Sequence, residues 1–118
     1  MSETISNIPE RLDIRSKAGA NRAFTLKFHL ADGSPRVITG QTVTLKVRKK
    51  RTSNATLLDV DAVVGTNVGV DDHHAVFSIS AAQMASIPCG CWVHDIDRDD
   101  AGTIHPALLG SFEVVSDV

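Results

Sequence analysis

The sequence predicts an all-β protein, a single antiparallel β-sandwich of about seven to nine strands with one short helical turn. Runs of alternating polar and apolar residues recur at intervals of roughly 8–12 residues, the strand spacing of small sandwiches. Residues that favour turns, chiefly Gly, Pro, Asn and Asp, separate these runs. No periodic helix longer than about two turns is visible in the sequence.

The composition fits one domain with one apolar core. The 118 residues are 42% hydrophobic and 22% charged, which is ordinary for a globular protein and excludes a disordered one. We expect one sandwich domain over residues 10–118, preceded by an unpacked polar arm over residues 1–9. Its core should be mostly Val, Ile, Leu and Ala around a few large side chains. These are Phe24, Phe28, Phe77, Trp92 and Phe112.

The first half of the chain contains two clear strand patterns. Residues 22–30 alternate cleanly, after a shorter alternation in residues 11–16. An Asp-Gly turn, Pro35 and a short edge piece at residues 37–38 lead to residues 42–50, which alternate again. The apolar side chains expected on inner strand faces are Leu12, Ile14, Phe24, Leu26, Phe28, Leu30, Val43, Leu45, Val47, Phe77 and Ile79.

The middle of the chain continues in extended form and then makes one helical turn. Residues 56–64 and 75–80 predict extended backbone. Ser80 and Gln83 have the spacing of a capping box, in which each side chain accepts a bond from the other residue's backbone amide. We therefore predict a helical turn near residues 81–87, stopped by a proline, that passes the chain between the sheets.

The C-terminal part predicts a hairpin. A strand over residues 91–98 precedes an Asp-Asp-Ala-Gly turn, and the return strand spans residues 103–115. One face of the first strand carries Trp92, His94 and Ile96. Pro106 indicates an edge or a bulge, and Gly110 indicates a second irregularity.

Cys89 and Cys91 could form half of a metal site, completed by His94 or by the pair His73 and His74. Structural zinc sites, however, use cysteines separated by two to four residues, with a second ligand pair at a recognisable spacing. Buried free thiols at the start of a strand, behaving as small hydrophobes, are the better interpretation. We expect neither a metal nor another cofactor.

An acidic stretch follows in residues 95–100 and resembles the opening of a calcium loop. Its acidic residues are Asp95, Asp97, Asp99 and Asp100. Asp100 occupies the position that needs glycine, and Pro106 the position that needs glutamate. The sequence favours the outer face of a strand running into an acidic turn, with a cation site there as the alternative.

A basic cluster of five residues occupies six positions, Lys46, Arg48, Lys49, Lys50 and Arg51. No aromatic residue is interleaved and the net charge is −2, so we expect no nucleic-acid partner. A solvated strand end that discourages edge pairing explains the cluster. A second hypothesis is that this basic end meets the acidic residues 95–100 of a neighbouring copy.

Catalysis and membrane insertion are not predicted. His73 and His74 lie in a predicted turn as surface residues, and no nucleophile motif accompanies them, so we expect no enzyme and no small-molecule substrate. No apolar run approaches the roughly 18 residues of a membrane span. The first residues lack the pattern of a signal peptide, which predicts synthesis in the cytoplasm.

Three segments carry a resemblance to a known family, residues 38–48 (ITGQTVTLKVR), residues 80–96 (SAAQMASIPCGCWVHDI) and residues 109–114 (LGSFEV). In this order they resemble small immunoglobulin-like β-sandwich proteins from the structural-gene regions of tailed bacteriophages and prophages. They are also similar to the N-terminal domains of some phage baseplate upper proteins. Trp92 and His94 depart from the pattern, which usually has tyrosines at these two positions, as does the Cys-Gly-Cys segment.

The resemblance implies a virion structural protein of the tail, baseplate or fibre attachment, made in the host cytoplasm. It would act by packing against other virion proteins and against copies of itself, as a homo-oligomer. A capsid decoration protein and a receptor- or carbohydrate-binding module are the alternatives. For the last of these, Trp92 is the aromatic residue that could contact a sugar.

Overall fold

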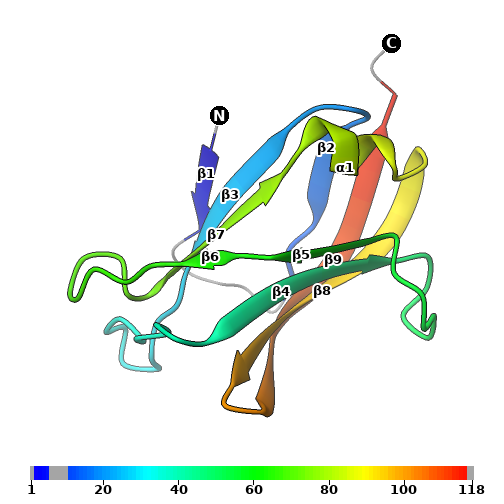
Figure 1. Ribbon diagram of the computed structural model, residues 1–118. Helices are drawn as coiled ribbons and strands as arrows, with labels where there is room; N and C mark the ends of the chain where they lie inside the picture. Colours follow the sequence, from blue (N-terminus) through cyan, green and yellow to red (C-terminus); the bar gives the residue numbers. More distant parts are fainter. Residues whose placement is uncertain (1, 6–10, 117–118) are drawn as a thin grey trace.

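The computed structural model describes residues 2–5 and 11–116, which form two facing β-sheets and one short helix (Figure 1). The elements are β1 (Ser2–Ile5), β2 (Ile14–Lys17), β3 (Arg22–Lys27), β4 (Thr42–Arg48), β5 (Leu58–Asp61), β6 (Val63–Val64), β7 (His74–Ile79), α1 (Ala81–Ala85), β8 (Gly90–Asp100) and β9 (Thr103–Val115). These nine strands and one helix confirm the predicted all-β class.

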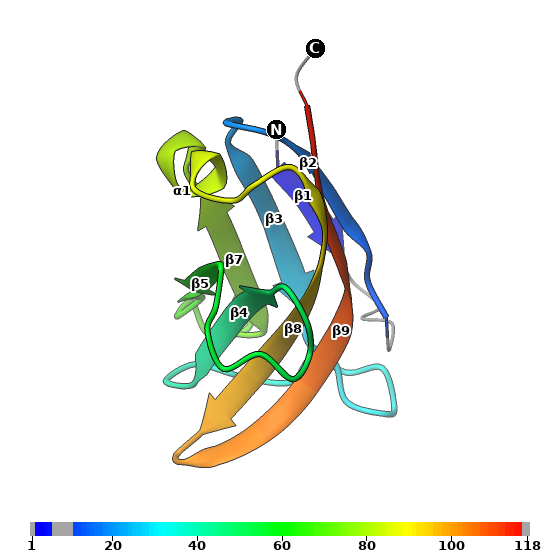
Figure 2. The ribbon, with the colours of Figure 1, turned by 90° about the vertical axis from the view of Figure 1, so that its right-hand side faces the viewer.

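The two sheets differ in size. The four-stranded sheet has the order β1-β3-β7-β6, and the five-stranded sheet has the order β2-β9-β8-β4-β5. Figure 2 shows β3 and β7 in one layer and β4, β8 and β9 in the other. α1 links β7 to β8, so it carries the chain from the first sheet to the second, as the sequence predicted.

Two strand pairs correct the expectation of a purely antiparallel sandwich. β1 runs parallel to β3, and β2 runs parallel to β9. The remaining pairs among the described strands are antiparallel. Alternating polarity assigns each side chain to a face but says nothing about the direction of the neighbouring strand. The alternating pattern therefore could not predict the direction of these two strands.

The N-terminal arm is also corrected in part. Ser2–Ile5 forms β1 and pairs in register with residues 23–26 of β3. This pairing is possible because an open sheet edge presents unpaired backbone N–H and C=O groups. The rest of the expected arm, Met1 and residues 6–9, lies outside the described residues.

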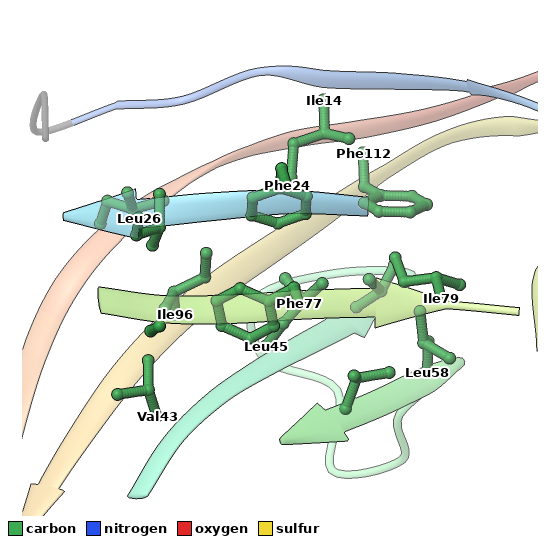
Figure 3. Close-up of a cluster of buried hydrophobic side chains, with 14 of the residues drawn as sticks. Ile14, Phe24, Leu26, Val43, Leu45, Leu58, Phe77, Ile79, Ile96 and Phe112 are labelled. Atoms are coloured by element: carbon green, nitrogen blue, oxygen red, sulfur yellow. The ribbon is translucent and has the colours of Figure 1, made fainter. Parts of the chain in front are cut away.

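The core fills the space between the sheets with apolar side chains (Figure 3). Phe24 and Phe77 come from neighbouring strands of the smaller sheet, and their rings stack with centroids 5.0 Å apart. Most of the expected inner side chains are buried. They are Ile14, Phe24, Leu26, Phe28, Val43, Leu45, Val47, Phe77, Ile79 and Ile96.

Two short stretches differ from the expected pattern. Leu30 was expected to face inward but is 41% exposed, because β3 ends at Lys27 and its alternation no longer applies there. Residues 37–38 do not form the expected edge strand. Instead, Ile38 points into the core from a loop, while the neighbouring Val37 is exposed.

The helical turn forms where the sequence placed it. Ser80 Oγ accepts a bond from the amide of Gln83 at 3.1 Å, and Gln83 Oε1 accepts from the amide of Ser80 at 2.9 Å, which confirms the capping box. Met84 is the buried residue of α1. At five residues α1 cannot cross a membrane, and no other described helix is long and apolar enough to do so.

The long hairpin of β8 and β9 carries one irregularity. Ile96 pairs with Leu108 whereas Asp97 pairs with Pro106, so Ala107 is an extra residue and the bulge predicted from Pro106 is confirmed. The second irregularity, expected at Gly110, is absent, because the register runs evenly past it. Gly110 is instead required by a close approach, since a Cβ atom there would lie 1.9 Å from the Leu12 carbonyl oxygen.

Candidate functional site

The two cysteines and His94 do not converge. Cys89 and Cys91 are free thiols and exposed, which corrects the expectation that they are buried. Cys91 lies on the outer face of β8, whereas His94 lies on the inner face and is 1% exposed. Across residues 2–5 and 11–116, no group of three or more His, Cys, Asp or Glu side chains could hold a metal ion.

His94 has a structural partner instead. Its Nε2 atom lies 2.6 Å from the carbonyl oxygen of Leu12, so this nitrogen must carry the proton and donate. The Nδ1 atom is buried without a hydrogen-bond partner, and the ring meets Phe112 edge-on. Burial lowers the pKa of His94, and the bond to Leu12 offsets part of this effect. His94 therefore ties β8 to the chain segment before β2.

The acidic stretch lies on a strand, as predicted, but β8 continues to Asp100, so the turn begins later than expected. Asp95 and Asp97 project from its outer face. Asp99 accepts a hydrogen bond at 2.8 Å from the amide of Gly102, the residue that closes the hairpin turn with Ala101. Asp99 thus supports the hairpin turn, whereas Asp95 and Asp97 lie next to one another on the outer face of β8.

The basic cluster is divided between a strand and the loop that follows it. Arg48 ends β4, and its Nη1 atom lies 2.8 Å from Oδ1 of Asp95 on β8. Lys46 is in register with Asp95 on one side and Asp59 on the other. Part of the charge complementarity that suggested a contact between copies is therefore satisfied within one chain. Residues 49–51 extend beyond the strand and are exposed.

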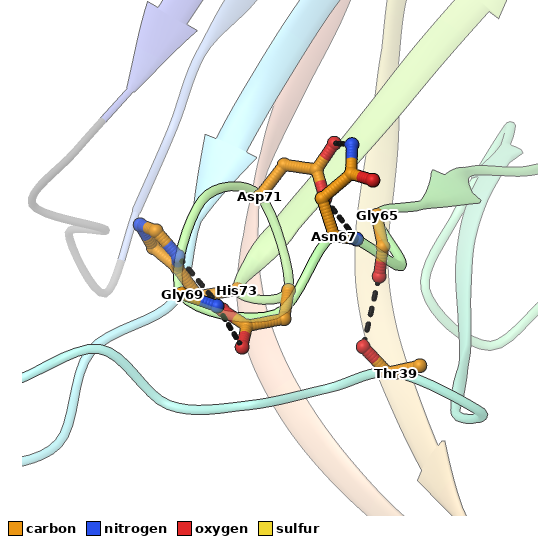
Figure 4. Close-up of polar contacts among 7 residues, drawn as sticks. Thr39, Gly65, Asn67, Gly69, Asp71 and His73 are labelled. Carbon is orange, nitrogen blue, oxygen red and sulfur yellow. Dashed lines mark hydrogen bonds and ion pairs between the residues drawn. The ribbon is translucent and has the colours of Figure 1, made fainter.

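His73 lies at the end of the loop before β7 (Figure 4), and His74 is the first residue of that strand. The ring of His73 contacts the rings of His29 and His74, with centroids 5.6 and 4.4 Å away. All three of these histidines are half-buried, so the expectation of surface histidines is wrong for this pair. His73 Nδ1 is 3.6 Å from the Asp72 carboxylate, which is too long for the oriented base of a catalytic pair.

Local hydrogen bonds hold several other polar groups of this loop. The Asp71 carboxylate accepts bonds from the backbone and side-chain amides of Asn67, at 2.7 and 3.1 Å. Asp72 accepts from the amide of Gly69 at 2.9 Å, and Thr39 donates to the carbonyl of Gly65 at 2.9 Å (Figure 4). These side chains therefore shape the loop.

A pocket of about 390 Å³ lies on the outer face of the five-stranded sheet. Its floor is formed by outward side chains of β8 and by the bulged part of β9, and the end of β4 with the following loop forms one wall. Apolar groups make up most of the lining, with two acidic and two basic side chains among them. The lining includes Arg48, Arg51, Val93, Asp95, Asp97 and Leu109.

The four charges in the pocket are not equally paired. Arg48 and Asp95 bond to one another, whereas neither Asp97 nor Arg51 has an ion-pair partner within 4.0 Å among the described residues. Burial raises the pKa of Asp97, and the adjacent Asp95 raises it further, against smaller opposite effects of Lys46 and Arg48. Asp97 is thus a carboxyl group whose ionised form is poorly supported by its own chain.

The comparisons with known proteins concern the fold. No protein-family profile matches the sequence, and no curated protein sequence is similar to it. The N-terminal domain of phage TP901-1 ORF48 has a similar structure, with a TM-score of 0.52 and 12% identity over 100% of both chains. The cysteine protease inhibitor EhICP2 from Entamoeba histolytica also matches, with a TM-score of 0.51 and 8% identity over 97% of this chain and 95% of that one.

Proposed function

We propose that this chain is a structural protein of a phage virion, a component of the tail, baseplate or fibre attachment. It acts by binding other virion proteins and copies of itself. The observation that supports this proposal is the shared fold with the N-terminal domain of phage TP901-1 ORF48, which extends over the full length of both chains. The likeness to the protease inhibitor has almost the same TM-score, so the shared fold does not by itself favour one function. The proposal therefore needs a second line of support.

That support comes from the three segments that resemble phage structural proteins. They contain β4, the stretch from α1 into β8, and the second half of β9. β9, β8 and β4 are consecutive strands of the five-stranded sheet. The three resembling segments therefore form adjacent strands of one sheet, as expected if the sequence pattern specifies this sheet.

The contacts of the polar side chains favour binding over catalysis. His94, Asp71, Asp72 and Asp99 each hold part of the fold, and Arg48 pairs with Asp95. What the outer surfaces offer is a mixture of charged and apolar groups, which suits contact between proteins.

The test is to locate the protein in particles of a phage or prophage that encodes it. Particles are purified on a density gradient, analysed by mass spectrometry, and labelled with an antibody against this chain for electron microscopy. We expect the chain in purified particles, with the label on the tail or its end. Label over the head would support the alternative of a capsid decoration protein, and absence of the chain from particles would overturn the proposal.

A further inference from the structure

From the outer pocket of the five-stranded sheet, we infer that two copies of this chain bind each other face to face, with Asp97 of each copy against Arg51 of the other. This inference deepens the proposed function, because it rests on the chain assembling with copies of itself. It names the surface and the pair of side chains that make the contact.

The two side chains without ion-pair partners, Arg51 and Asp97, lie at opposite ends of the pocket. Arg48 pairs in register with Val93, and Arg51 follows it in the loop, so Arg51 lines the end of the pocket near Val93. Asp97 follows Val93 by four residues on β8, so their Cα atoms are about 13 Å apart at roughly 3.3 Å per residue. The pocket therefore has a cation without an ion-pair partner at one end and a carboxyl group without one at the other.

Two-fold symmetry would bring these two side chains together across a contact between copies. A two-fold axis that lies in the contact plane and crosses the strands reverses the strand direction in the second copy. The Arg51 end of each pocket then faces the Asp97 end of the other, so both unpaired charges find partners in one operation. Sheets that pack face to face lie about 10 Å apart, a separation that side chains of this size span.

The charges of the pocket are balanced. Two basic and two acidic groups give the pocket a net charge of about zero, so a strongly acidic or strongly basic partner gains little from it. A copy of the same surface is complementary to it group by group. Leu109, on the outer face of β9 and 43% exposed, adds apolar surface that this contact would cover. A guanidinium beside Asp97 would also favour its ionised form.

The experiment measures the self-association of the purified full-length chain by sedimentation equilibrium. In a two-fold dimer the contact between residues 51 and 97 occurs twice. Arg51→Asp places two carboxylates in each contact and Asp97→Arg places two guanidinium groups there, so each variant should weaken the dimer at least about tenfold. The double variant Arg51→Asp/Asp97→Arg exchanges the two charges and should restore the dimer. Lys50→Asp makes the same charge change next to Arg51 but outside the pocket lining, and should leave the dimer unchanged.

Circular dichroism confirms that each variant is folded, and Leu109→Asn replaces any single variant that is not. A monomeric wild-type chain, a dimer that both single variants leave intact, or a double variant that stays monomeric would each overturn the inference. So would a small molecule or a different protein bound in the pocket of a chain that stays monomeric. If the chain is present in particles but does not dimerise through this pocket, the proposed function stands and this surface assignment fails.

Discussion

The imidazole Nε2 of His94 lies 2.6 Å from the carbonyl oxygen of Leu12, and this bond joins the second-longest strand of the sandwich to the segment that precedes β2. His94 is in register with Gly110 of β9, and the segment containing Leu12 passes over Gly110, so the three residues meet at one crossing point. A buried histidine and a glycine without room for a side chain thus hold the same crossing point, which leads to the first two predictions.

The first prediction concerns acid stability. Burial lowers the pKa of His94 in the folded chain below its unfolded value of about 6.5. The unfolded chain therefore binds the proton first as the pH falls, so the free energy of unfolding is steady above about pH 6.5 and decreases below it. His94→Gln removes this titration and should flatten the decrease in urea unfolding measured from neutral to mildly acidic pH. His74→Gln is the comparison, because burial lowers the pKa of His74 as well.

The second prediction concerns the crossing point at Gly110. A Cβ atom there would lie 1.9 Å from the Leu12 oxygen, so Gly110→Ala should lower the free energy of unfolding by about 1–3 kcal/mol, and Gly110→Asn by more. Gly19 is the control, since it has φ of 71° and open space around it. There Asn should be tolerated better than Ala, because Asn adopts left-handed backbone more readily. The same order of Asn and Ala at both positions would contradict this account.

The third prediction tests the capping box of α1. Ser80→Ala removes the acceptor for the Gln83 amide and should cost about 1 kcal/mol of unfolding free energy. Because Gln83 returns a bond to Ser80, a double-mutant cycle of the two residues should show a coupling energy different from zero. Ser78→Ala, at an exposed position on β7, should change stability by less than about 0.5 kcal/mol.

The fourth prediction concerns the N-terminal residues. The buried hydrophobic side chains of the described chain run from Ile14 to Val114, so a chain lacking residues 1–9 should still fold cooperatively. Its assembly into particles should fail, and the edge of β3 at residues 23–26 would be left unpaired. Denaturant unfolding and particle composition measure these two effects separately. Normal particle assembly by the truncated chain would contradict this prediction.

The fifth prediction separates core packing from sugar binding at Trp92. Its ring is partly buried against the core, packs against Gly90, and donates its indole N–H to the carbonyl of Pro88 at 2.9 Å. We expect blue-shifted fluorescence that glycans do not change. A red-shifted spectrum that responds to a panel of glycans would favour the carbohydrate-binding module instead.

The fold class was predictable because the information for it is local. Alternation identifies strands such as β3 and β4, and the Ser80 and Gln83 pair identifies the start of α1. The bulge was predictable from Pro106, which cannot donate a ladder hydrogen bond. The parallel neighbours of β1 and β2 were not predictable, because strand direction depends on contacts between distant parts of the chain.

The sequence did not predict the pocket, because the pocket also depends on contacts between distant parts of the chain. Asp97 and Arg51 are far apart in sequence, and they line one depression only because β4 and β8 pair in a particular register beside the bulge of β9. The sequence did suggest that the basic and acidic segments belong together. It could not show that Arg48 and Asp95 satisfy each other within one chain and leave two other charges unpaired.

The parallel pairing of β2 with β9 bears on mechanical strength. Ile14 lies opposite Phe112 and Lys17 opposite Val115, so both strands run in the same direction. The chain therefore enters β2 at one end of the pair and leaves β9 at the other end. Tension applied through the chain before β2 and the chain after β9 would pull along the strands, loading all the bonds of this ladder together. A hairpin pulled at its open end breaks its bonds one at a time. This geometry suits a part that must carry load along its length.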